Sequence, residues 1–130
     1  MKETKEALGF YANLNVDHRA NLFIVSAILN GHPVRVLVDT GASISFIAAH
    51  FLPKLSIDLN QLSSAEDGMV VSLGDSSKSP VSRKLEGAEF VIGKHSSSTD
   101  FYLLSLPRGF DVVIGLDWMT KYDVQLSITA

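Results

Sequence analysis

Cysteine is absent from this sequence of 130 residues, so the chain can form neither a disulfide bond nor a thiolate nucleophile. Metal-ligand spacing is missing as well, because the histidines lie far apart, at His18, His32, His50 and His95. We therefore expect no metal site and no cofactor. A chain without cysteine is compatible with a reducing compartment such as the cytoplasm.

Basic clusters and long apolar runs are also missing. The net charge is −3 and the lysines and arginines are scattered, whereas a nucleic-acid surface normally concentrates them. The longest apolar runs, such as FIVSAIL at 23–29, are far shorter than the ~20 residues of a membrane-spanning helix. We expect neither a nucleic-acid nor a membrane partner.

The composition fits one globular domain. Hydrophobic residues make up 46% of the chain and charged residues 19%, which is enough apolar surface for a core. No internal repeat or linker divides the sequence. The alternating charges of KETKE indicate a solvated end, so we expect a partly flexible extension at 1–19 and a single domain at 20–130.

Most segments show strand signals. Two β-rich runs flank Asn30-Gly31, a dipeptide typical of tight hairpins. Two shorter runs flank GDSSKS at 74–79, which predicts a second hairpin. Further strands are expected at 86–93 and 100–106, separated by a loop at 94–99, and then at 110–115 and near 124–128.

Helical signals are fewer. The sequence predicts a short helix from about Ser45 to Phe51, ended by Pro53, and a helical turn after Gly115. The polar segment 56–68 is rich in turn-forming residues and is expected to be a surface loop. Together these features predict a mostly β domain with one or two short helices.

The stretch VRVLVDTGASISFI, at 34–47, contains the clearest candidate site. Asp39 follows a strand that is apolar on one face and nearly so on the other, where a carboxylate is costly unless it is hydrogen-bonded, paired or used. Asp39-Thr40-Gly41 alone could be an ordinary strand-ending turn. However, the small residues Ala42 and Ser43 leave room for a second backbone or a substrate, and another apolar strand ending in glycine lies downstream.

The segments LVDTGASISFI at 37–47 and FDVVIGLDWM at 110–119 resemble the two motifs of retropepsin-like aspartic proteases, most closely the protease domains of gypsy-class long-terminal-repeat retrotransposons. The resemblance extends over residues 20–128. It implies an all-β, mainly antiparallel, closed barrel-like fold. It also implies a homodimeric aspartic endopeptidase that acts on a polypeptide substrate, a retroelement polyprotein, in the cytoplasm or within retroelement particles.

The residue types agree with this chemistry. Hydrolysis without a metal or a nucleophile needs a base to activate water and an acid for the leaving group, and two carboxylates that share a proton supply both. Asp39 is the one aspartate in a DTG or DSG sequence, since Asp67-Gly68 lacks the hydroxyl residue. The second carboxylate is therefore expected from a second copy of the chain.

The resemblance alone implies the roles of individual residues. Asp39 would be catalytic, Thr40 would hydrogen-bond across the two-fold axis, and Gly41 and Ala42 would support the turn. The flap over the substrate would include Leu73, Gly74, Asp75 and Ser76. Four residues of the second motif would be structural, with the glycine allowing close approach to the DTG turn: Ile114, Gly115, Asp117 and Trp118.

Two other interpretations stay open. A domesticated or inactive member of the family could bind peptides or dimerise a larger protein, for example a ubiquitin-linked one, without cutting. A small β-barrel with an accidental DTG would share only the tripeptide. The intact DTG favours a protease, since a protein that is not an enzyme has little need of a carboxylate pair.

Overall fold

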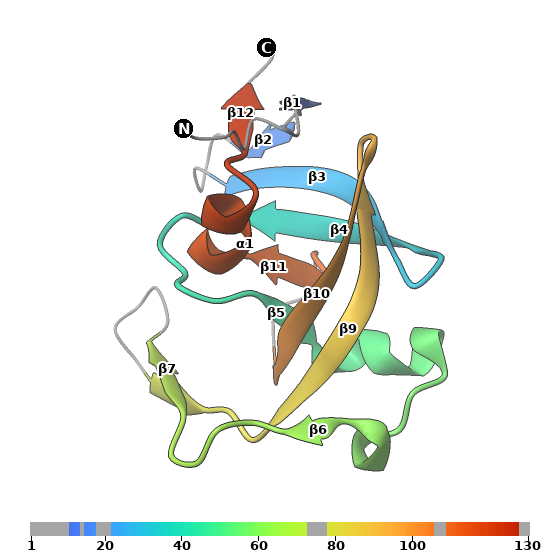
Figure 1. Ribbon diagram of the computed structural model, residues 1–130, viewed down its shortest axis with the longest axis vertical. Helices are drawn as coiled ribbons and strands as arrows, with labels where there is room; N and C mark the ends of the chain where they lie inside the picture. The colour runs from blue at the N-terminus through green and yellow to red at the C-terminus, as the bar shows by residue number, and fades with distance from the viewer. Residues whose placement is uncertain (1–10, 14, 18–21, 73–77, 106–108, 128–130) are drawn as a thin grey trace.

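The structure, a computed structural model, describes residues 11–13, 15–17, 22–72, 78–105 and 109–127 (Figure 1). Its centre is a closed barrel whose strands run, in spatial order, β3 (Leu22–Leu29), β4 (His32–Val38), β11 (Val112–Ile114), β5 (Phe46–Ala48), β10 (His95–Leu104) and β9 (Arg83–Ile92). Strand β9 closes the ring by pairing with β3. The closed, mostly β fold expected from the sequence is confirmed, with parallel pairs β4–β11 and β5–β10 among the antiparallel ones.

Asn30 and Gly31 turn β3 into β4. Both residues have positive φ, +47° and +82°. These values are typical of a type I′ turn, whose twist matches that of the paired strands. The hairpin predicted from the dipeptide is confirmed. It carries β4 back along β3, so that β4 ends just before Asp39.

Short elements surround the barrel. Strand β2 (Asn15–Asp17) pairs with β3, and β6 (Ser63–Ser64) pairs with β9, while β1 (Tyr11–Asn13) lies parallel to β12 (Gln125–Ser127). Strands β7 (Val70–Ser72) and β8 (Lys78–Pro80) form the predicted second hairpin, whose tip at 73–77 lies outside the described residues. The one α-helix in the described part of the chain is α1 (Leu116–Lys121), and none of its helices is long and apolar enough to span a membrane.

The helix predicted at Ser45–Phe51 is wrong over its first half. Residues Phe46–Ala48 form β5, which is fully buried between β11 and β10, and a 3₁₀ helix, η2 (Ala49–Leu55), follows. Pro53 lies inside η2 and does not end it. Pairing with two neighbouring strands outweighs the local helical tendency of the segment. A short 3₁₀ helix tolerates proline because only one N–H is lost.

Two predicted loops are also more regular than expected. Residues 95–99 belong to β10, and the turn between β9 and β10 is confined to the two residues before them. Their hydroxyl groups are used within the sheet, since Ser97 donates to the Phe90 carbonyl at 3.4 Å and shares a hydrogen bond with Thr99 at 2.9 Å. The polar segment 56–68 contains η3 (Leu59–Gln61), β6 and the buried Leu62.

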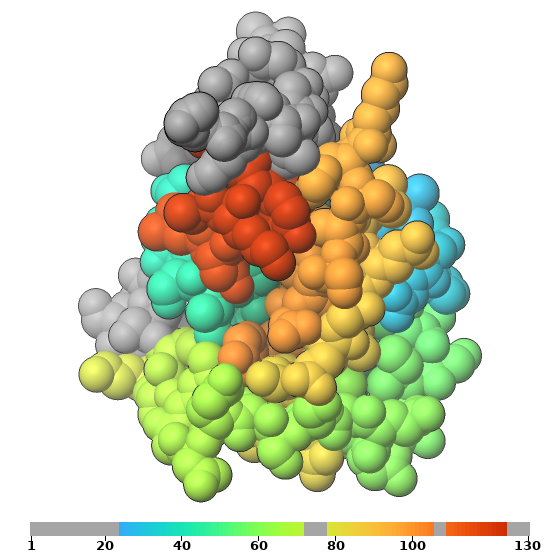
Figure 2. Space-filling view, in the orientation of Figure 1, coloured from blue at the N-terminus to red at the C-terminus, as the bar shows by residue number. Residues whose placement is uncertain are grey.

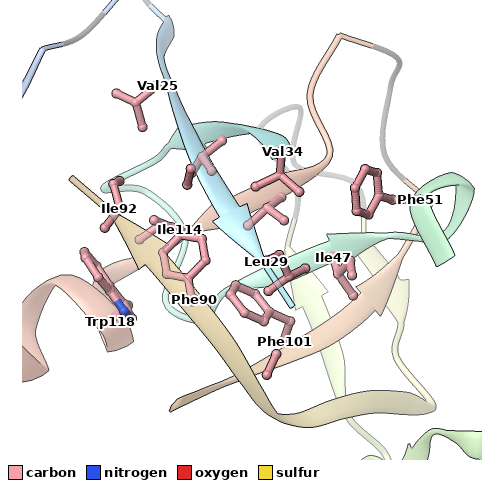
Figure 3. Packing of buried hydrophobic residues seen from close by; sticks show 14 of the residues in the cluster. Val25, Leu29, Val34, Ile47, Phe51, Phe90, Ile92, Phe101, Ile114 and Trp118 are labelled. Carbon is pink, nitrogen blue, oxygen red and sulfur yellow. The ribbon is translucent and has the colours of Figure 1, made fainter. Parts of the chain in front are cut away.

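The core fills the barrel with side chains from both halves of the sequence (Figure 3). Phe90 and Phe101 are fully buried and pack edge to face, with ring centroids 5.4 Å apart. Trp118, from α1, lies 5.6 Å from the Phe90 ring in a similar geometry. Burying an aromatic ring is a large favourable contribution. The second sequence motif is therefore anchored in the barrel interior.

His95 lies half-buried beside this core. Its ring centroid is 4.7 Å from that of Tyr122 and 5.7 Å from that of Trp118. Burial disfavours the imidazolium cation and lowers the pKa of His95 below its ordinary value.

The free energy of unfolding is expected to depend on pH through His95. Between the lowered folded pKa and the unfolded value of about 6.5, the unfolded chain holds more protons. The contribution of neutral His95 to the free energy of unfolding should therefore be complete above the unfolded pKa of about 6.5, and it should be lost as the pH falls from there through the lowered folded pKa. Urea unfolding at about pH 7.5 and about pH 5.5 measures the loss. His95→Phe should reduce the loss, while His32→Phe, at an exposed position, should not. Equal losses in all three proteins would contradict the assignment.

Candidate active site

Asp39 stands where β4 reaches the surface of the barrel. The preceding residues Val36–Val38 are buried, whereas Asp39 is exposed in the single chain. Its N–H donates to the carbonyl of Ile114, in β11, at 3.0 Å. The carboxylate is thus presented to solvent from a residue whose backbone is fixed to the barrel.

The DTG turn holds this carboxylate with its own backbone. The N–H of Gly41 donates to Asp39 Oδ1 at 2.8 Å, and the N–H of Ala42 donates to the Asp39 carbonyl at 3.1 Å. A Cβ at position 41 would lie 3.1 Å from the same carboxylate oxygen, closer than ordinary van der Waals contact. Glycine therefore leaves the carboxylate in place. Thr40 is exposed beside it.

The second sequence motif lies directly behind the turn. Leu116 and Asp117, at the start of α1, donate their N–H groups to the carbonyls of Ala42 at 2.8 Å and Ser43 at 3.2 Å. A Cβ at Gly115 would lie 2.7 Å from the Ala42 carbonyl oxygen and closer still to the Ile44 carbonyl oxygen. The two backbones approach each other as only a glycine permits.

Ser45 joins the two motifs through its side chain, a role that sequence reasoning missed. Its hydroxyl donates to Asp117 Oδ1 at 2.7 Å and accepts from the Gly115 N–H at 3.0 Å, and its N–H donates to Asp117 Oδ2 at 3.1 Å. Asp117 Oδ1 also accepts from the Trp118 N–H at 2.7 Å. Ser45 is completely buried. A lone small hydroxyl residue between two large apolar ones is the signal that could have identified it.

A hollow of about 270 Å³ opens beside the DTG turn. One wall comes from residues 41–44 and Phe46, and the other from Met69, Val70 and Val71 at the start of the β7–β8 hairpin. Most of the lining side chains are apolar, while the exposed lining surface is divided almost evenly between polar and apolar atoms. An exposed carboxylate beside a hollow of this kind is an arrangement suited to binding a polypeptide segment and acting on it. The described residues contain no cluster of three or more potential metal ligands.

The structure brings together most of the residues singled out in the sequence. Asp39, Thr40, Gly41 and Ala42 form the turn at the surface, and Ile114, Gly115 and Asp117 lie behind it, while Trp118 enters the core. The predicted flap residues Leu73, Gly74, Asp75 and Ser76 lie outside the described residues. The described part of the hairpin places Met69–Val71 against the hollow instead.

Comparisons with known proteins give a family model and similar folds. A family model described as retroviral aspartyl protease matches residues 10–130. Among solved structures, the chain is similar to a retropepsin-like aspartic protease from Rickettsia conorii, with 18% identity, coverage of 83% of this chain and 76% of that chain, and a TM-score of 0.53. No curated protein matches the chain.

Two further structures show the same fold. EIAV protease complexed with the inhibitor HBY-793 is 16% identical and has a TM-score of 0.60, with coverage of 80% of this chain and 90% of that chain. The retroviral protease-like domain of Ddi1 from Leishmania major is also 16% identical, with a TM-score of 0.55 and coverage of 80% and 79%. At such identities the likeness establishes the fold alone.

Replacing Ser45 by alanine should weaken the support of the DTG turn. The change leaves the Gly115 N–H without its acceptor and removes one donor from Asp117 in a buried place. The free energy of unfolding should fall by ~1–3 kcal/mol, measured by urea unfolding. Ser43→Ala, two residues away and exposed, is the matched control and should change stability by less than about 0.5 kcal/mol. A Ser45→Ala protein as stable as this control would refute the role given to Ser45.

Proposed function

Because the chain belongs to the retroviral aspartyl protease family, we propose that it is an aspartic endopeptidase that acts as a homodimer. The observation that carries this proposal is the Asp39 carboxylate, exposed at the end of a buried strand and hydrogen-bonded to the Gly41 N–H. A turn that merely ended a strand would need neither the backbone contacts from residues 115–117 nor the hollow beside it.

Each chain supplies one half of the catalytic pair. The DTG sequence occurs once, so a pair of carboxylates requires two copies with their Asp39 side chains facing each other. Two such carboxylates cannot both ionise and therefore share one proton. The ionised group takes a proton from a water molecule, which attacks the carbonyl carbon of the peptide bond. The protonated group donates its proton toward the leaving nitrogen.

The exposure of the DTG turn supports this arrangement. Asp39, Thr40 and Gly41 all face solvent in the single chain. In a two-fold dimer the same patch of each copy would meet its counterpart, and Thr40 would hydrogen-bond across the axis. A stable interface of this kind is expected to bury more than ~1,200 Å².

The substrate class follows from the hollow and from the sequence motifs. The apolar lining next to Asp39 supports a polypeptide substrate. The motifs at 37–47 and 110–119 support a gypsy-class retroelement polyprotein, processed in the cytoplasm or in retroelement particles. A domesticated module that binds peptides without cutting them would keep the fold and the hollow but show no cleavage.

Asp39→Asn is expected to abolish cleavage and leave the fold intact. Asparagine keeps the size of the side chain and an oxygen that accepts from Gly41, but it cannot exchange a proton with water. A peptide panel, with and without a general aspartic-protease inhibitor such as pepstatin, measures the activity. The control is Asp58→Asn, which removes the same charge from an exposed helix cap where asparagine serves equally well. Cleavage by Asp39→Asn at the wild-type rate would exclude this mechanism.

Activity should belong to the dimer. Specific activity is expected to fall on dilution as the two half-sites separate, and sedimentation at the same concentrations should show dissociation. Mixing wild-type chains with an excess of Asp39→Asn chains should suppress activity, because each mixed dimer retains one carboxylate. A monomer with constant specific activity at all concentrations would require a second carboxylate within the chain.

A further inference from the structure

Glu66 is the acceptor in a polar cluster at the base of the β7–β8 hairpin. The hydroxyl of Tyr102 donates to its carboxylate, with oxygen–oxygen distances of 3.0 and 3.2 Å. The Lys84 ammonium lies 3.7 Å from Glu66 and 3.6 Å from Glu86, and 5.6 Å from the centre of the Tyr102 ring. We call Glu66, Lys84 and Tyr102 the elbow cluster.

The elbow cluster connects the barrel to the hairpin. Lys84 and Tyr102 stand directly opposite each other on β9 and β10. Glu66 belongs to the segment that leads from β6 to β7, which Figure 2 shows in yellow-green, packed against the lower parts of β9 and β10 in yellow and orange. Side chains from two barrel strands therefore hold one residue of the segment that enters the hairpin.

The hairpin begins one tight turn after Glu66. The carbonyl of Glu66 accepts from the Met69 N–H at 3.2 Å, which closes a tight turn containing Gly68 at φ +73°. Met69, Val70 and Val71 then line the hollow beside the DTG turn. Glu66 is thus connected to the first residue of this wall through one tight turn.

Tyr102 also holds the opposite wall. Its backbone N–H donates to the carbonyl of Ser45 at 3.0 Å, and it pairs in register with Phe46 of β5. One residue therefore contacts the segment after the DTG turn through its backbone and the start of the hairpin through its hydroxyl. The Tyr102–Glu66 hydrogen bond therefore links the two walls of the hollow.

The ionisation states favour this bond. The backbone N–H of Glu66 and the Tyr102 hydroxyl hold the pKa of Glu66 below its ordinary value. Partial burial and the bond to Glu66 raise the pKa of Tyr102. At neutral pH a neutral phenol therefore donates to a carboxylate anion, which gives a stronger hydrogen bond than two neutral groups do.

We propose that Tyr102, acting through Glu66, is a positioning residue that sets the distance between the β7–β8 hairpin and the DTG turn, and thereby the affinity for the peptide substrate. The inference rests on the proposed function, because it treats the hollow as the place where substrate binds. The reacting carboxylate, Asp39, lies in the DTG turn beside the other wall, formed by residues 41–44 and Phe46. Loss of the bond should therefore weaken substrate binding and leave the chemical step nearly unchanged.

Steady-state kinetics on one peptide tests this role. Tyr102→Phe and Glu66→Ala each remove the hydrogen bond, and each should raise KM roughly three- to tenfold with kcat within about twofold of wild type. Glu86→Gln removes a carboxylate that also contacts Lys84 but lies on β9 outside the hairpin, and Tyr122→Phe removes a tyrosine hydroxyl elsewhere. Both controls should keep the wild-type KM. An unchanged KM in Tyr102→Phe, or an equal fall of kcat in all four variants, would overturn the proposal.

Hydrogen exchange tests the same role without cleavage. In an Asp39→Asn background, Tyr102→Phe should speed exchange at the amides of Val70 and Val71 and leave the barrel strands unchanged. Unchanged exchange in the hairpin, or faster exchange throughout the barrel, would overturn the positioning role. If the wild-type chain cleaves no peptide, the proposed function fails, and the exchange result alone decides whether Tyr102 positions the hairpin.

Discussion

The carboxylate of Asp117 joins two segments that are far apart in the sequence. It accepts hydrogen bonds from the hydroxyl and the N–H of Ser45 and from the N–H of Trp118. Because the Trp118 ring is buried in the barrel, the loop after the DTG turn is fixed relative to the core. Satisfied polar networks of this kind specify a single geometry, since any displacement leaves a buried group without a partner. The orientation of Asp39 therefore depends on packing well away from it.

The exposure of Asp39 has a physical reason in the proposed homodimer. An ionised carboxylate buried alone is costly, whereas a solvated one is not. The fold leaves the DTG turn at the surface of the single chain and supports it from behind. Two copies would bury their carboxylates together. Because the two groups would share one proton, much of the free-energy cost of burying two charges would be removed. Ser45 is buried and supports the DTG turn from inside the single chain, whereas Asp39 is exposed in the single chain and would be buried only in the dimer.

Local signals in the sequence predicted local structure. Asn30-Gly31 predicted its hairpin because the dihedral angles are a property of those two residues. The helix predicted at 45–51 is wrong because β5 is determined by pairing with β10 and β11, which come from the second half of the chain. The DTG sequence could be recognised, but the contacts of Ser45 with Asp117 and of Tyr102 with Glu66 join distant residues. A single sequence carries no record of such pairs.

The placement of β11 also constrains the order in which the molecule can fold. In the barrel β4 and β5 are not neighbours, because β11, made from residues 112–114, lies between them. The acceptor for the Asp39 N–H is in that strand. Contacts so distant in sequence form slowly, after the loop between them has closed. During synthesis the ribosome must release the chain past Trp118 before the DTG turn acquires its support. A nascent chain that carries Asp39 therefore lacks these supporting contacts until the residues up to Trp118 have emerged.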